Sequence, residues 1–166
     1  LRDIGRLDEA IESYHKAYTI RPDFPEAVYN AGYVQLVLGD LDSAIDGFKQ
    51  AIKINPEFSE AFNNLGNIYR ERKQLIEAEQ SFIKAIQINP DYAEAHNNLG
   101  TVYRDKSELD AARVSFQKAL EIRPDFTEAH HNLGLINREQ GNLELASENF
   151  QRALDFDPNF AEAHYN

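Results

Sequence analysis

The sequence predicts an all-α protein, a solenoid of stacked antiparallel helical hairpins, and three observations support this prediction. The first is a 34-residue repeat that runs through the chain of 166 residues. The second is apolar residues at helical spacing within each repeat. The third is a proline that returns at every step, at Pro22, Pro56, Pro90, Pro124 and Pro158. One hairpin of this length cannot bury its apolar faces alone, so neighbouring hairpins must stack.

Four further positions keep the same phase: two alanines, an aromatic residue and a glycine. They are Ala10, Ala44, Ala78, Ala112 and Ala146; Ala17, Ala51, Ala85, Ala119 and Ala153; Tyr14, Phe48, Phe82, Phe116 and Phe150; and Gly32, Gly66, Gly100 and Gly134. The phase divides the chain into a single array with four whole repeats between two partial ones. The segments are residues 1–24, 25–58, 59–92, 93–126, 127–160 and 161–166.

Each repeat is predicted to be a helix, a short turn and a second helix. In the third whole repeat the first apolar face falls at His96, Leu99, Gly100 and Tyr103. The second falls at Leu109, Ala112, Phe116, Ala119, Leu120 and Ile122. Pro124 ends the second helix, because its ring disfavours helical geometry in the preceding residue. We expect Gly100 and Ala112 to lie opposite each other where the helices cross.

Two expectations concern the first part of the chain and its ends. Asp40 is predicted to be an N-cap or a first-turn acid, and residues 7–20 a second helix without its first. The sequence contains no methionine, so we expect the chain to be a fragment of a longer protein. Because no polar capping repeat closes the array, we also expect weak end-to-end self-association.

The second whole repeat resembles the tetratricopeptide repeat family, whose signature runs aromatic, Leu-Gly, Tyr, Ala, aromatic, Pro. The matching residues are Phe62, Leu65, Gly66, Tyr69, Ala78, Phe82 and Pro90. Other repeats depart from the signature at Ala31, Gln35 and Asn137. The resemblance implies a right-handed superhelix. It also implies that the first helices line a concave face, which binds an extended peptide or a partner's helix.

One position of the first helices carries an asparagine in every repeat. These residues are Asn30, Asn64, Asn98, Asn132 and Asn166. A side-chain amide both donates and accepts hydrogen bonds, so a row of amides can bind the backbone of an extended peptide without reading its sequence. Alternatively, each asparagine bonds the adjacent repeat or its own turn. The sequence leaves both interpretations open.

The asparagine row is similar to the ladder in the tetratricopeptide superhelix of O-linked N-acetylglucosamine transferases, which holds the backbone of substrate peptides. The likeness covers the ladder and the repeat type only, because the chain has no room for a glycosyltransferase domain. We therefore predict a protein–protein interaction scaffold that binds a peptide or partner segment in its groove, and no enzyme. The alternative is the substrate-binding arm of a larger enzyme such as a protein O-glycosyltransferase.

Charged residues form further rows on the first helices. Arginines stand at Arg2, Arg70, Arg104 and Arg138, with Leu36 in the remaining repeat. An acidic residue follows each arginine, which favours a solvated, self-neutralised surface. Alternatively, the arginines on the concave face bind carboxylates of a ligand. First-turn glutamates, which favour the helix dipole, stand at Glu26, Glu60, Glu94, Glu128 and Glu162.

Composition argues against several classes of partner. A net charge of −11 would repel a nucleic acid, and no apolar run is long enough to span a membrane. Cysteine is absent, so there are no thiolate metal ligands. The histidines His96, His130 and His164 hold the aromatic position of the signature, so we expect them to pack between helices. We predict no metal, no cofactor, a protein or peptide partner and a cytoplasmic location.

Overall fold

The computed structural model describes residues 2–160, with side chains from residue 6 onward. The described chain is helical throughout, with no strand. Its helices are α1 (Arg2–Ile20), α2 (Pro25–Val37), α3 (Leu41–Ile54), α4 (Ser59–Glu71), α5 (Leu75–Ile88), α6 (Ala93–Asp105), α7 (Leu109–Ile122), α8 (Thr127–Glu139) and α9 (Leu143–Phe156). Helices α2 to α9 form four hairpins with the predicted 34-residue period, so the predicted all-α solenoid is confirmed.

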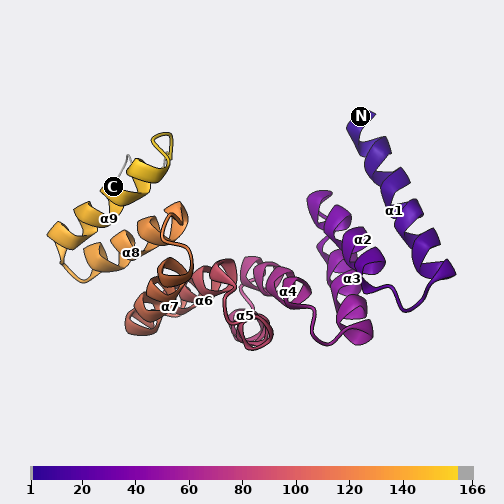
Figure 1. Cartoon of the computed structure of the whole chain (residues 1–166), viewed down its shortest axis with the longest axis horizontal. Coiled ribbons are helices and arrows are strands. Elements are labelled where there is room, and N and C mark those ends of the chain that lie inside the picture. Colours follow the sequence, from indigo (N-terminus) through magenta and orange to yellow (C-terminus); the bar gives the residue numbers. More distant parts are fainter. Residues whose placement is uncertain (1, 161–166) are drawn as a thin grey trace.

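The hairpins stack side by side into an arc, with α1 and α9 at its two ends (Figure 1). In this view α4 and α6 lie on the inner side of the arc, and α5 and α7 lie on the outer side. Each second helix packs against the next first helix, and the first helices α4, α6 and α8 also contact one another in sequence. The inner surface of the arc is therefore formed by first helices.

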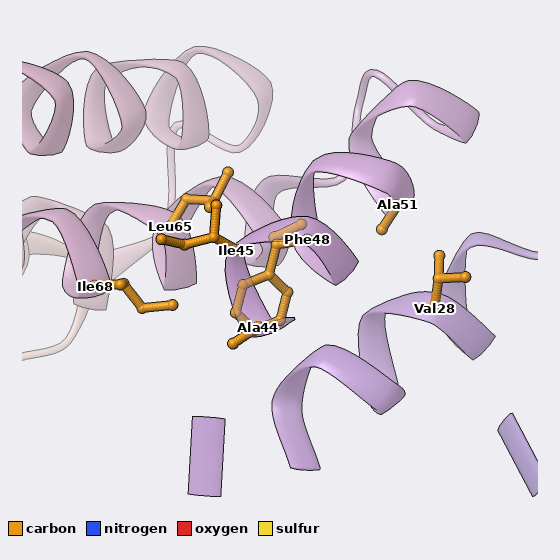
Figure 2. Packing of buried hydrophobic residues seen from close by; sticks show 8 residues of the cluster. Val28, Ala44, Ile45, Phe48, Ala51, Leu65 and Ile68 are labelled. Carbon is orange, nitrogen blue, oxygen red and sulfur yellow. The ribbon is translucent and has the colours of Figure 1, made fainter. Parts of the chain in front are cut away.

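A buried phenylalanine lies at the centre of each of the first three hairpins. Phe48, Phe82 and Phe116 are completely buried, and burying a side chain of this size contributes roughly 1.5–3 kcal/mol. Figure 2 shows Phe48 among Ala44 and Ile45 of its own helix, with Leu65 and Ile68 of the next repeat nearby. The apolar core is therefore continuous between hairpins, which makes each repeat depend on its neighbours.

The repeating glycine makes room for this phenylalanine. A Cβ atom placed on Gly100 would lie 2.7 Å from Cε1 of Phe116. The same conflict occurs at Gly66 with Phe82, and at Gly134 with Phe150. In the first whole repeat, a Cβ atom placed on Gly32 would lie 3.2 Å from the backbone oxygen of Ala44. The placement of Gly100 opposite Ala112 stays a prediction.

Each hairpin turn contains one residue in the left-handed region. These residues are Gly39, Lys73, Ser107 and Gly141, with φ of 82°, 60°, 64° and 79°. A side chain is unfavourable in this conformation, yet the repeat keeps it at Lys73 and Ser107. The four hairpins therefore adopt the same turn conformation whether or not the residue at this position is a glycine.

The helix ends follow the predicted signals, with one exception. Helix α7 ends at Ile122, and Arg123 before Pro124 is extended, with φ of −132° and ψ of 91°. Asp40 is the N-cap of α3 and accepts a hydrogen bond from the backbone N–H of Ser43 at 3.1 Å. The exception is α1, which begins at Arg2 rather than residue 7. Its helix continues through the position where the other repeats turn.

Candidate functional site

The described residues form an open groove of about 690 Å³ between repeats two, three and four. Helices α4 and α6, the loop before α8 and the first turn of α8 provide its walls. The lining residues are Asn63, Asn67, Glu94, Asn97, Asn98, Arg123, Asp125, Phe126, Thr127 and Glu128. Because the helical members all belong to first helices, the groove lies on the inner side of the arc.

The asparagine row forms hydrogen bonds from each repeat to the one before it. Nδ2 of Asn98 donates to Oδ1 of Asn63 at 3.1 Å, and Nδ2 of Asn132 donates to Oδ1 of Asn97 at 3.0 Å. Asn64 donates to the hydroxyl of Tyr29 at 2.9 Å. The bond to the adjacent repeat, one of the two interpretations of the row, is therefore present in three repeats.

These bonds use only part of the capacity of the amides. A primary amide carries two N–H donors and two acceptor lone pairs, and the bond to the neighbouring repeat takes one donor from Asn98. Asn98 is half-buried and lines the groove. Binding of a peptide backbone by the row therefore stays a prediction that the bonds between repeats leave room for. Asn30 is half-buried on the same row, and Asn166 lies outside the described residues.

The acceptors of these bonds are buried amides on the floor of the groove. Asn63 and Asn97 are only 6% and 8% exposed. Each accepts through Oδ1, and neither amide nitrogen donates a hydrogen bond within the described part of the chain. Neither nitrogen is among the buried side-chain atoms that lack a hydrogen-bond partner, so both are accessible from the groove to an acceptor from outside.

The predicted arginines lie away from the groove floor. Arg70 and Arg104 are half-buried and Arg138 is exposed, and none of the three lines the groove. Arg104 donates to Oδ1 of Asn132 at 3.3 Å, which ties it to the asparagine row. The side chain of Arg2 is outside the described part. Whether the arginines bind ligand carboxylates stays a prediction.

One arginine that sequence reasoning did not single out does line the groove. Nη1 of Arg123 lies 2.5 Å from Oε1 of Glu94, and its guanidinium lies 3.5 Å from the centre of the Phe126 ring. The ion pair joins the loop before α8 to the start of α6. Arg123 therefore closes one wall of the groove, and its charge is largely balanced by Glu94.

Two tyrosines next to the glutamate row are held in the neutral form. Burial raises the pKa of Tyr92 to about 12, and the carboxylates of Glu60 and Glu94 act in the same direction. Burial also raises the pKa of Tyr29, against the effect of the hydrogen bond from Asn64. The carboxylates thus produce a negative potential on this side of the first helices.

Two histidines bond the loop that precedes their own helix, at the end of the preceding repeat. Nε2 of His96 lies 3.0 Å from the carbonyl oxygen of Pro90, and Nε2 of His130 lies 2.9 Å from that of Pro124. Since a carbonyl only accepts, Nε2 is the protonated nitrogen in both rings. His130 is buried and stacks on Phe156, while His164 lies outside the described residues. His130 therefore packs between helices as predicted. His96 is half-buried, and its packing between helices stays a prediction.

Residues 2–160 contain neither a metal-binding cluster nor a membrane-spanning helix. No group of three or more histidine, cysteine or acidic side chains there could hold a metal ion. None of the described helices combines the length and the apolar character that crossing a membrane requires.

Several groove residues were missed by sequence reasoning. Asn63 and Asn97 form a second amide row one position before the predicted row, and Asn67 lies one turn further along α4. The doublets Asn63–Asn64 and Asn97–Asn98 are visible in the sequence with the repeat period. They could have indicated that one row accepts from the other.

Comparisons with known families agree with the repeat. A model described as a tetratricopeptide repeat matches residues 57–125, and another with the same description matches residues 115–146. A TPR repeat model matches residues 1–39, 37–71 and 134–166. Among curated proteins, no sequence matches this chain.

Solved structures share the fold over nearly the whole chain. A crystal structure of MamA is 28% identical with a TM-score of 0.83, over 97% of this chain and 94% of that one. YrrB, described as a TPR protein with an unusual peptide-binding site, is 27% identical with a TM-score of 0.78, over 99% and 85%. A thermophilic TPR protein of Thermus thermophilus is 28% identical with a TM-score of 0.76, over 99% and 90%.

Proposed function

Because this chain belongs to the tetratricopeptide repeat family, we propose that it is a protein interaction scaffold whose inner groove binds an extended segment of a partner protein. The observation that carries the proposal is the pair of buried amides, Asn63 and Asn97, on the floor of the groove. Their free N–H groups match the carbonyl oxygens of a peptide backbone. An extended backbone presents such acceptors at regular intervals, as the repeat presents donors.

The asparagine row completes this arrangement. Asn98 lines the groove directly, and Asn64 and Asn132 hold the equivalent place on the neighbouring first helices. Contacts to backbone atoms would allow partners of different sequence. At the C-terminal ends of the same helices, Arg70, Arg104 and Arg138 would bind carboxylates of the bound segment. The proposal assigns no catalytic step to any of these residues.

The test starts from peptides selected against the intact chain from a random phage-displayed library. The affinity of a selected peptide is then measured for the chain and for a variant with Asn64→Ala, Asn98→Ala and Asn132→Ala. Each lost hydrogen bond to the peptide should weaken binding by about 2- to 10-fold.

A matched control separates lost contacts from lost structure. Gln117→Ala removes an exposed amide from α7, a second helix, and should leave the affinity unchanged. Circular dichroism shows whether the triple variant keeps its helices, since it also loses the bonds between repeats. A helical triple variant with the original affinity, or failure to select any groove-dependent peptide, would contradict the proposal.

A further inference from the structure

The charged residues that line the groove are mostly acidic. Glu94, Asp125 and Glu128 face one arginine, Arg123, and Arg123 is already paired with Glu94. Asp125 and Glu128 are exposed, and no ion pair within the described residues uses either of them. The groove therefore keeps two carboxylates that stand outside the ion pair of Arg123 with Glu94.

The floor of the groove does not offset this charge. Asn63 and Asn97 are neutral, and their free N–H groups lie beside the carboxylates that line the same groove. Nε of Arg123, which lines the same groove, is a buried donor without a partner among the described residues. This observation is independent of the acidic residues, because it indicates that an outside acceptor completes the site. A single ligand that satisfies both features brings carbonyl oxygens to the floor and positive charge to the rim.

Each arginine of the first helices α4 and α6 stands far from the first-turn glutamate of its own helix. Arg70 and Arg104 follow Glu60 and Glu94 by ten positions on their helices, which is roughly 15 Å at about 1.5 Å per residue. Exposed charges this far apart are largely screened, because the Debye length is about 8 Å at physiological salt. The glutamate end of each of these first helices is therefore negative with respect to its own helix, while Arg104 reaches α8 at Asn132, one helical turn beyond Glu128.

We propose that the segment bound in this groove is a basic one, an extended peptide whose lysine or arginine side chains lie against Asp125 and Glu128. This inference rests on the proposed function and adds the charge of the partner to it. Glu60 repeats the position of Glu94 and Glu128 on the preceding first helix, so a second basic side chain has a site there.

The repeat also sets the spacing of the basic residues. Neighbouring packed helices lie roughly 8–10 Å apart, and an extended chain advances about 3.3 Å per residue. One step along the row of first helices therefore corresponds to about three residues of the bound segment. Lysines at every third position should bind better than the same number of lysines placed in a block.

The experiment compares four labelled peptides of equal length by fluorescence anisotropy with the intact chain. Their variable positions carry lysine at every third residue, lysine in a block, glutamine, or glutamate. Two charge contacts should make the spaced lysine peptide bind roughly tenfold more tightly than the glutamine peptide at low salt. Added salt should remove most of this advantage.

Matched variants locate the effect. The pair Asp125→Asn with Glu128→Gln should remove the preference for lysine and leave the glutamine peptide unaffected. The control pair, Asp46→Asn with Glu148→Gln, makes the same change in net charge at exposed positions of the second helices α3 and α9, and should preserve the preference. This control separates a local contact from the attraction of the whole acidic chain.

The outcomes distinguish this inference from the proposed function. If all four peptides bind equally and only the triple asparagine variant weakens them, the basic partner is wrong and the groove function stands. If the glutamate peptide binds best, the arginine row decides specificity and the inference is overturned. If the control pair removes the preference as fully as the groove pair does, the carboxylates of the groove are not the site. If none of the four binds, the inference is overturned, and the library selection still decides the groove function.

Discussion

At Gly66 a side chain is missing because the ring of Phe82 fills the space that it would need. A Cβ atom there would lie 2.7 Å from both Cε1 and Cζ of the ring and 2.9 Å from Cδ1. Phe82 is completely buried, so its ring has no solvent space into which to move. The two positions are therefore coupled, although sixteen residues separate them in the sequence.

This coupling predicts the effect of Gly66→Ala. Forcing a methyl group against a fixed ring should lower the free energy of unfolding by about 1–3 kcal/mol, measured by urea denaturation. In the background of Phe82→Leu, the same substitution should cost less, because the smaller side chain frees the space. Gln80→Ala, an exposed helical position in α5, is the control. Fully additive effects of the two substitutions would show that the ring is not the obstacle.

The hydrogen bonds of the asparagine row could be predicted from the sequence only in part. The row that includes Asn64, Asn98 and Asn132 was found from its period, but the acceptors of its hydrogen bonds were not. Those acceptors, such as Asn63 for Asn98, are 35 residues away along the chain. A period identifies equivalent positions in different repeats, whereas the bond joins two different positions of neighbouring repeats. Such a partner depends on how the hairpins are offset when they stack.

At the scale of the hairpin, the same turn is made by residues of different conformational freedom. Gly39 and Gly141 occupy the left-handed region without a side chain, while Lys73 and Ser107 adopt the same region with one. A non-glycine residue there costs roughly 1–2 kcal/mol. The packing of the hairpin on its neighbours holds the turn in place and compensates for this cost.

Lys73→Gly should therefore stabilise the protein. Glycine relieves the backbone strain of the left-handed turn, and this gain exceeds the conformational entropy that glycine adds to the unfolded chain. We therefore expect an increase of about 0.5–1 kcal/mol in the free energy of unfolding. The opposite change, Gly141→Ala, should destabilise by conformation alone, because no atom lies within 4 Å of the added Cβ. Chemical denaturation of the three proteins tests both signs. A loss of stability for Lys73→Gly would mean that its side chain contributes more than the strain costs.

The bounds of the helices were largely predictable, since the prolines that follow the second helices recur with the period. Helix α1 was not, because its first residues continue the helix at the place where α2 gives way to a turn. Gly5 stands in phase with Gly39, yet only the second adopts the turn. A glycine permits a left-handed turn without requiring one, and a first helix that packs against the second is what makes the turn form.

At the scale of the molecule, the arc has an inner surface because every hairpin in the stack places its first helix on the same side. The first helices approach one another, and the second helices lie outside them (Figure 1). The sequence predicted this surface through the family resemblance, and the groove on it through the asparagines. Its acidic rim was not recognised, because first-turn glutamates are explained equally well by the helix dipole. Their position beside the loop with Asp125 is what supports the proposed contact with a basic segment.

The stacking that builds the array also predicts that the chain associates with itself. Apolar side chains remain exposed at both ends of the arc: Ile20 on α1 is 84% exposed, and Leu145 and Phe156 on α9 are each 50% exposed. Each end resembles the surface that another hairpin covers inside the stack, so one chain can continue the stack of the next. The buried area would be small, and contacts of that size are weak and reversible.

Sedimentation velocity over a range of concentrations should therefore show a weight-average sedimentation coefficient that rises with concentration and falls again on dilution. The double change Leu145→Glu with Phe156→Glu should abolish the rise, because pairing the ends would then bury two charges. Ile76→Glu, on an exposed part of α5 away from both ends, should leave it unchanged. A coefficient that stays at the monomer value at the highest concentration would contradict the prediction. Loss of the rise in the Ile76→Glu variant would place the contact on the outer face of the arc instead.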